Sequence, residues 1–381
     1  MRVRFLLVLN KRKGVEVTTI EQQIKEIEDE IARTQYNKAT EHHIGLLKAK
    51  IARLKEKAAH AKKAGSGKGF AVKKEGDATL VMVGFPSVGK STLLNRLTGA
   101  KSQVAAWEFT TKEVIPGVLW HRGAQIQILD IPGIIEGAAE GKGMGKMVLS
   151  TVRTADMVVI VTDPKRIDKI QLIFDELEKA NIRLDKEPPD IKINKKQLGG
   201  ITINGKPGLS ENTIKDVLKT FGILNADVII KKPITIDELI DHLSKSCVYI
   251  PSLIVLNKAD ELNQSEIKKL EEYVKEKFKK DMIVVSAEKN INIDKLKDII
   301  YEKLKFIQVY TKRKEGKELG EPMIVRKGTT VRDICLRIHK DFLEKFKYAL
   351  VNGKSAKYPN QRVGLDHVVM DQDIITIIAE K

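Results

Sequence analysis

The stretch "TLVMVGFPSVGKSTLLNRLTG", Thr79–Gly99, decides the fold of this chain. It begins as a short apolar run, continues as a G-x-x-x-x-G-K-S loop from Gly84 to Ser91, and ends in an amphipathic segment. A strand, a glycine-rich loop and a helix in this order are the context in which such a loop binds phosphate. Backbone amides and the positive end of the helix dipole attract the anion. The stretch therefore predicts a phosphate-binding loop at one edge of an α/β sheet.

Two side chains of this loop have predictable roles. Lys90 is expected to reach the β- and γ-phosphates of a nucleotide, and the Ser91 hydroxyl can ligate Mg2+. The whole loop and the first helical turn are predicted to contact the nucleotide: Gly84, Phe85, Pro86, Ser87, Val88, Gly89, Lys90, Ser91 and Thr92.

A second loop follows the apolar strand "QIQILDI", Gln125–Ile131, and contains the D-x-x-G pattern "DIPG". Asp130 is predicted to hold a water of the Mg2+ ion, and the Gly133 amide to bond to the γ-phosphate. The segment after Gly133 would then be ordered only while that phosphate is present, as in a switch segment.

The stretch between these loops, "AAWEFTTKEVIPG", offers a further metal ligand. A threonine in this position commonly binds Mg2+ when the γ-phosphate is present. Thr111 is the favoured candidate, with Thr110 and an ordinary threonine-rich loop as the alternatives.

The run "PSLIVLNKADEL", Pro251–Leu262, predicts how the base is recognised. The Asp260 carboxylate can accept two hydrogen bonds from guanine, whereas adenine would leave a buried carboxylate unpaired. Lys258 is expected to cover the base, and Asn257 to tie this loop to the phosphate loop. Further on, the backbone of Ser286 and Ala287 is expected to face guanine O6. The sequence therefore predicts a GTP site, and an ATPase is disfavoured.

The motifs "GFPSVGKST", "EFTT", "DIPGIIEGA", "NKAD" and "SA", in this order, resemble the Obg class of translation-factor-related GTPases. Within that class the chain resembles the developmentally regulated GTP-binding protein family from residue 19 onward. The resemblance implies hydrolysis of GTP to GDP and phosphate in a nucleotide-dependent switch that acts on the ribosome or RNA in translation. Lys90, Thr111 and Gly133 would carry catalysis, and Mg2+ would be the cofactor.

Ile134 stands where many regulatory GTPases carry a glutamine that orients the attacking water. Since an aliphatic side chain cannot orient water, we predict slow intrinsic hydrolysis. An activating partner protein or a cation could supply the missing charge, an effect worth about 10³ to 10⁵ in rate. Ser87 stands where related K+-using GTPases often carry asparagine, which leaves K+ dependence open. An alternative function is a nucleotide-gated RNA or ribosome scaffold in which hydrolysis is only a slow timer.

Composition narrows the class of protein. The chain has 381 residues, with 68 Lys plus Arg against 51 Asp plus Glu and a net charge of +17. This balance favours contact with nucleic acid, and the alternative is the Lys- and Glu-rich surface of a heat-stable protein. No apolar run approaches the roughly 20 residues that span a bilayer. Only two cysteines are present, so we expect a cytoplasmic protein without disulfides. We also expect a monomer.

From Phe306 onward, "FIQVYTK", "EPMIVRKGTTVRDICLRIH", "YALVNG" and "DIITIIAEK" alternate strands with one helix and resemble a TGS domain. The predicted fold class is α/β: a doubly wound P-loop GTPase sheet with an N-terminal helical hairpin, an α+β insert and this C-terminal β-grasp (TGS) domain. Apolar residues repeat at spacings of three and four before residue 63, which predicts the hairpin. Its basic second helix and the linker after it are either a solvated face with a flexible tether or an RNA-binding arm. The predicted boundaries are 1–18 for a disordered or mis-assigned start, 19–65 for the hairpin, 66–167 and 237–304 for the GTPase domain, 168–236 for the insert and 305–381 for the TGS domain.

Overall fold

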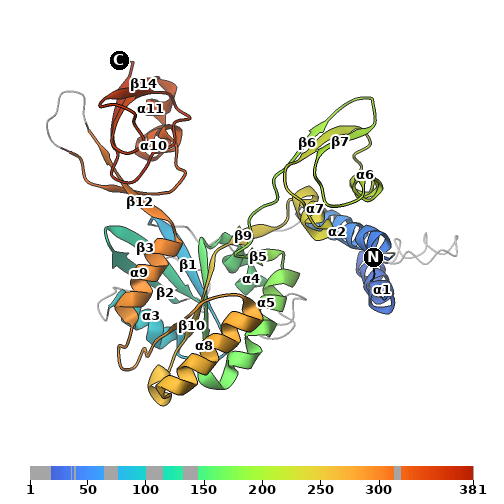
Figure 1. Cartoon of the computed structure of the whole chain (residues 1–381), viewed down its shortest axis with the longest axis horizontal. Helices are drawn as coiled ribbons and strands as arrows, with labels where there is room; N and C mark the ends of the chain where they lie inside the picture. Colours follow the sequence, from blue (N-terminus) through green and yellow to red (C-terminus); the bar gives the residue numbers. More distant parts are fainter. Residues whose placement is uncertain are drawn as a thin grey trace, which may run out of the picture. The chain divides into compact units, whose positions relative to one another are not determined.

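The computed structural model describes residues 19–35, 37, 40–63, 76–99, 115–131, 145–312 and 319–380 (Figure 1). The chain forms two compact units. Residues 1–69 and 187–248 make up the first, called here the N-terminal unit, and residues 70–186 and 249–381 make up the second, called the core unit. The predicted start at residues 1–18 lies outside the described residues.

A six-stranded sheet in the order β11-β10-β4-β1-β3-β2 is the centre of the core unit. All neighbouring strands are parallel except the pair β2–β3. Every residue of β1, β4 and β10 is buried, which explains their unbroken apolar runs, since a parallel sheet is covered on both faces. The strands are β1 Ala78–Val83, β2 Ile115–His121, β3 Ala124–Asp130, β4 Met157–Thr162, β10 Ser252–Leu256 and β11 Met282–Val284.

Helices cover both faces of this sheet, as the doubly wound prediction requires (Figure 1). The apolar residues of α3 and α9 share one core cluster with alternate residues of β1, β3 and β4. Figure 1 shows α4, α5 and α8 on the other side. Because the parallel strands end at the same edge, the loops after β1, β3, β4 and β10 meet there. The helices are α3 Lys90–Thr98, α4 Gly145–Thr154, α5 Ile170–Lys179, α8 Gln264–Phe278 and α9 Ile293–Lys303, with short 3-10 helices η1 Pro164–Lys169 and η2 Ala259–Glu261.

The C-terminal part of the core unit is a five-stranded sheet in the order β13-β12-β16-β14-β15 with a core of its own. Helix α10, Val331–Ile338, starts at an N-cap formed by Thr330. Helix α11 is Lys340–Glu344. The strands are β12 Phe306–Thr311, β13 Met323–Arg326, β14 Phe346–Asn352, β15 Gln361–Val363 and β16 Ile374–Ala379.

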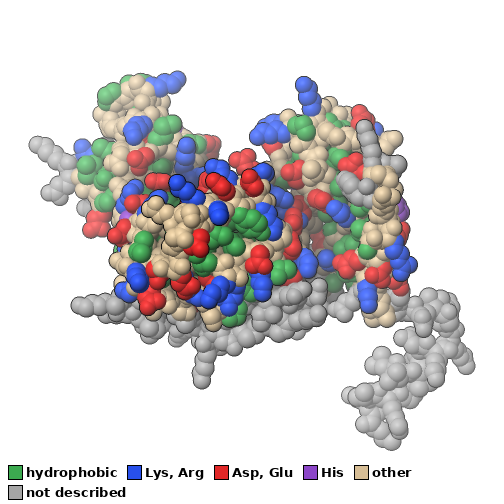
Figure 2. Space-filling model, turned by 60° about the horizontal axis from the view of Figure 1, so that its bottom comes forward, with side chains coloured by type: hydrophobic (Ala, Val, Ile, Leu, Met, Phe, Trp, Pro, Cys, Tyr) green, Lys and Arg blue, Asp and Glu red, His purple; other side chains and the backbone are tan. Residues whose placement is uncertain are grey.

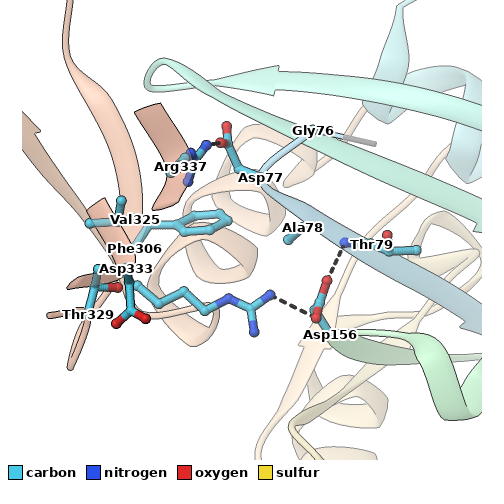
Figure 3. Close-up of a pocket in the computed structure, with 11 residues that line it drawn as sticks. Gly76, Asp77, Ala78, Thr79, Asp156, Phe306, Val325, Thr329, Asp333 and Arg337 are labelled. Atoms are coloured by element: carbon cyan, nitrogen blue, oxygen red, sulfur yellow. Dashed lines mark hydrogen bonds and ion pairs between the residues drawn. The ribbon is translucent and has the colours of Figure 1, made fainter. Parts of the chain in front are cut away.

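Figure 3 shows the seam where this C-terminal sheet meets the start of β1, around a pocket of about 350 Å³. The side chains of Phe306 and Ile324 belong to the core cluster of the large sheet. Arg326 forms an ion pair with Asp156 at 2.9 Å, and Arg337 pairs with Asp77. Apolar contact and two ion pairs therefore hold the C-terminal domain against the six-stranded sheet.

The N-terminal unit combines the hairpin with the insert. Helices α1 and α2 pack on each other, and α2 also packs against α6 and α7. Ala49 of α2 is fully buried in the same cluster as the apolar residues of the insert. The elements are α1 Ile20–Arg33, α2 Glu41–Lys63, β6 Ile191–Lys195, β7 Ile201–Gly205, α6 Glu211–Thr220, β8 Ala226–Ile230 and α7 Ile236–Ser244. The structure thus joins in one core two segments that were predicted as separate domains.

The insert also starts and ends later than the predicted 168–236, since the compact unit covers 187–248. At the first boundary, α5 buries Ile170, Ile173 and Leu177 and stays with the core unit. At the second, α7 buries Ile236 and Leu239 in the N-terminal unit. The short pair of strands β5, Ile182–Leu184, and β9, Val248–Ile250, lies where the chain leaves and re-enters the core unit.

Within the described parts of the chain, no helix is long and apolar enough to cross a membrane.

Candidate nucleotide-binding site

The phosphate loop runs from the end of β1 to the start of α3, and two of its positions accept only glycine. A Cβ atom on Gly84 would lie 2.2 Å from the carbonyl oxygen of Val161 in β4. Gly89 has a φ of +89°, and a Cβ there would lie 2.3 Å from Nδ2 of Asn257. The loop is therefore pressed between β4 and the loop after β10. Pro86, Ser87 and Thr92 are exposed along it.

Lys90 is the first residue of α3, and its side chain folds back inside the loop. The Lys90 Nζ donates hydrogen bonds to the carbonyl oxygens of Gly84 at 3.2 Å and Phe85 at 3.1 Å. Burial lowers the pKa of Lys90, and the nearby charge of Asp130 opposes this shift. The ammonium is thus held within the curl of the loop, where the negative charge of a phosphate group would stabilise it.

Ser91 and Asp130 meet beside this ammonium. The Ser91 hydroxyl donates to Oδ2 of Asp130 at 2.5 Å. Burial raises the pKa of Asp130, while the Ser91 hydrogen bond and the charge of Lys90 lower it in part. A hydroxyl and a carboxylate are the hard oxygen donors that Mg2+ prefers, so these two residues fit that ion. In the described residues, no group of three or more His, Cys, Asp or Glu could hold a metal by itself.

Asn257 joins the phosphate loop to the loops that follow β10 and β11. Its buried side chain donates from Nδ2 to the Val88 carbonyl and accepts at Oδ1 from the Ala287 amide, both at 3.0 Å. These two hydrogen bonds use both ends of one amide, so a single side chain fixes the spacing of three loops.

The pattern at this edge of the sheet has counterparts in known proteins. A family model described as "50S ribosome-binding GTPase" matches residues 79–195, a model for the C-terminal region of that GTPase domain matches 198–306, and a TGS domain model matches 307–379. The chain is 50% identical to a GTP-binding protein of Methanocaldococcus jannaschii over 96% of this chain and 94% of that one.

Relatives with a more specific name are similar along their whole length. The identity is 46% to Developmentally-regulated G-protein 3 of Arabidopsis thaliana, over 95% of this chain and 99% of the relative. It is 42% to Developmentally-regulated GTP-binding protein 2 of Homo sapiens, over 94% and 98%. The chain belongs to the developmentally regulated GTP-binding protein family. The expected resemblance, the P-loop GTPase fold and the C-terminal TGS domain are thereby confirmed.

In this member of the developmentally regulated GTP-binding protein family, two details of the base-binding loops differ from the prediction. Asp260 is exposed, not buried, because the short helix η2 carries it to the rim. The Ser286 hydroxyl hydrogen-bonds to it and lowers its pKa. In addition, the Ser286 amide donates to the Ile291 carbonyl and the Ala287 amide to Asn257, so neither amide is free to face a base. A guanine O6 would have to share the Ala287 amide with Asn257.

Sequence reasoning missed Arg96, which lies in the last turn of α3. Its Nε donates to the Ala287 carbonyl at 2.8 Å and its Nη2 to the Glu288 carbonyl at 3.0 Å. No motif marks this arginine, because its partners are backbone atoms of a loop far along the chain.

Asp163 was missed as well. It follows β4 directly, is buried, and contacts the Lys258 ammonium, which also donates to the Ser87 carbonyl at 3.0 Å. A signal existed: like Asp130, it is a carboxylate at the end of a buried strand. The four remaining residues of the predicted switch and metal site, Thr110, Thr111, Gly133 and Ile134, lie outside the described residues.

Proposed function

We propose that this GTPase binds GTP together with Mg2+, hydrolyses it slowly to GDP and phosphate, and acts as a nucleotide-dependent switch on the ribosome or RNA in the cytoplasm. The observation that carries the proposal is the direct hydrogen-bonded connection of its loops. Ser91 bonds to Asp130, and Asn257 bonds to both Val88 and Ala287. Four loops distant in sequence thus form one site at one edge of a sheet.

The chain's own residues supply most of the chemistry. Lys90 would exchange its two carbonyl partners for phosphate oxygens and stabilise the charge that spreads over them during transfer. Ser91 would ligate Mg2+ and Asp130 would hold one of its waters, and the bound ion would supply positive charge to the phosphates. Thr111 and the Gly133 amide would complete the γ-phosphate site, and Ile134, unlike a glutamine in this position, could not orient the attacking water. Slow turnover follows from that last feature.

Two observations support the ribosome or RNA as the partner. The family model that matches residues 79–195 carries the description "50S ribosome-binding GTPase". The net charge of +17 favours contact with phosphates. On the face drawn in Figure 2, Lys and Arg side chains lie among Asp and Glu. Binding of RNA to this face would therefore use many separate cations. The affinity for RNA should then fall steeply with salt concentration.

Single-turnover GTP hydrolysis with and without ribosomes tests the proposal. We expect slow hydrolysis by the protein alone and strong stimulation by ribosomes, and Lys90→Met should abolish nucleotide binding in both conditions. Tight GTP-dependent binding to ribosomes without stimulation would favour the alternative, a scaffold in which hydrolysis is a timer. Fast hydrolysis by the isolated protein would contradict the role assigned to Ile134.

Competition between ATP and labelled GTP tests the choice of base separately. The predicted role of Asp260 requires GTP to bind much more tightly, and equal affinities would overturn the assignment of a guanine site.

A further inference from the structure

Asp163 is a buried carboxylate at the edge of the nucleotide site, and none of the motifs accounts for it. It follows β4 and precedes the 3-10 helix η1, and its side chain is 2% exposed. Its Oδ2 accepts from Nη1 of Arg166 at 2.6 Å and from Nζ of Lys258 at 3.2 Å. Its Oδ1 has no hydrogen-bond partner within the described part of the chain. Two cations therefore share one oxygen, while no donor in the described residues reaches the other, buried oxygen.

If Asp163 served only to stabilise the fold, this arrangement would be an unfavourable one. A buried polar atom without a partner destabilises the folded state, and the two cations that accompany it are each about one-third exposed. The position of the carboxylate, next to the lysine of the base-binding loop, gives it a function instead.

Lys258 is held at both ends. Its backbone adopts a left-handed conformation with φ of +62°, and its ammonium lies between Asp163 and the Ser87 carbonyl of the phosphate loop. The aliphatic stem between these two anchors therefore has a restricted set of conformations. A side chain that is fixed before a ligand arrives loses less conformational freedom when it packs against that ligand.

We propose that Asp163 is a positioning residue for the guanine nucleotide: it holds the Lys258 ammonium against the phosphate loop, so that the lysine stem is already in place to cover the base. This inference rests on the proposed GTP site. Arg166 competes for the same carboxylate oxygen, so it weakens the hold of Asp163 on Lys258. The strength of base binding is then set by how one carboxylate is divided between two cations.

Dissociation of a fluorescent GDP analogue, measured by stopped flow in the presence of Mg2+, tests the proposal. Asp163→Asn and Lys258→Met should each accelerate dissociation by about tenfold, as expected for loss of one charge-assisted hydrogen bond. The double variant should be no faster than Lys258→Met alone, because both changes remove the same interaction. Arg166→Met should slow dissociation, because Asp163 would then hold Lys258 alone. The matched control is Lys165→Met, which removes an exposed cation from the same 3-10 helix and should have no effect.

Three outcomes would overturn the inference: additive effects of the Asp163 and Lys258 changes, unchanged dissociation in Asp163→Asn, or a melting temperature of the nucleotide-free variant that falls in parallel with binding. Asp163→Glu keeps the charge and tests the inference if the asparagine variant folds poorly. Its dissociation rate should lie closer to that of the wild type than the rate of Asp163→Asn does.

A second readout is the ratio of the affinities for GDP and inosine diphosphate. Asp163→Asn should leave this ratio unchanged, because Asp260 and not Lys258 is expected to recognise the 2-amino group. If the wild-type protein binds no guanine nucleotide, the proposed function fails; if it binds but the variants do not couple, only this inference fails.

Discussion

At the scale of single residues, Arg96 connects helix α3, which follows the phosphate loop, to the loop after β11. Its two hydrogen bonds to backbone carbonyls are charge-assisted, and one of them is partly buried. We expect Arg96→Met to weaken GTP binding by about 1 kcal/mol, or roughly fivefold, because the loop loses its anchor. Equilibrium titration with a fluorescent GTP analogue measures this change. Arg96→Lys can keep one hydrogen bond, so its GTP affinity should lie between those of the wild type and Arg96→Met. An unchanged affinity in Arg96→Met would show that Asn257 alone fixes the loop.

We predict that Asp130 makes nucleotide binding depend on pH. Because burial raises its pKa, the carboxylate takes up a proton at a higher pH than an ordinary aspartate does. The protonated form cannot serve Mg2+, so Mg2+-dependent GTP affinity should fall as the pH drops from neutral toward this raised pKa. For folding the sign is opposite: the contribution of Asp130 to stability is present below its unfolded pKa and is lost as pH rises through the folded one. GTP titrations from pH 7 to about 5 measure the first effect. Asp130→Asn should remove that pH dependence, and a profile that stays flat until an ordinary aspartate titrates would contradict the shift.

The sequence could predict that Lys90, Ser91, Asp130 and Asn257 meet, because parallel strands deliver their following loops to one edge of the sheet. It could not predict that Asp260 is exposed. That depends on a three-residue turn of 3-10 helix, which carries the carboxylate to the rim. Tertiary contacts of this kind have no period and no motif in the sequence.

At the scale of elements, the cap of α10 stabilises the C-terminal domain. The Thr330 hydroxyl accepts from the Asp333 amide, and the Asp333 carboxylate accepts from the Thr330 amide. We expect Thr330→Ala to destabilise the domain by about 1 kcal/mol, seen as faster hydrogen exchange of the α10 amides. Thr329→Ala, outside the capping box, is the control. Since the Thr330 amide lowers the pKa of Asp333, the contribution of this carboxylate is present above its unfolded pKa and is lost as pH falls through the folded one. Equal exchange in the two variants would contradict the role of the cap.

Helix α2 stabilises the insert as well as the hairpin. Apolar periodicity predicted α1 and α2 correctly, but periodicity cannot say which partner covers a second apolar face. The structure places Ala49 in the core of the insert, with Ile214 and Leu239. We expect Ala49→Asp to unfold the N-terminal unit, because an unpaired charge in that core costs at least about 3 kcal/mol. Hydrogen exchange should then rise together in α2 and in β6, β7 and β8.

The matched control is Lys50→Asp, which places the same side chain one position along, at an exposed site. It should leave exchange in the insert unchanged. If Ala49→Asp exposes α2 while the insert strands stay protected, the two segments fold separately and the shared core is not required.

At the scale of the whole molecule, strand β1 runs from the seam with the C-terminal sheet to the phosphate loop. It begins at the seam, where Thr79 donates its amide to Asp156, and it ends at the phosphate loop that starts with Gly84. Asp156 in turn pairs with Arg326 of the C-terminal sheet. A change in the position of the C-terminal domain would therefore act first on the strand that supports the phosphate loop.

The double variant Arg326→Ala, Arg337→Ala tests what holds that domain. Each ion pair is partly exposed and is worth at most about 1 kcal/mol, so the domain should stay folded while the seam loosens. We expect the distribution of distances between spin labels on α9 and α10 to broaden, and the Thr79 amide to exchange faster. Arg332→Ala, which removes an ion pair with Asp366 inside the C-terminal domain, should change neither. If the double variant also leaves both unchanged, the apolar contacts of Phe306 and Ile324 hold the seam by themselves, and the arginines have no part in fixing the domain.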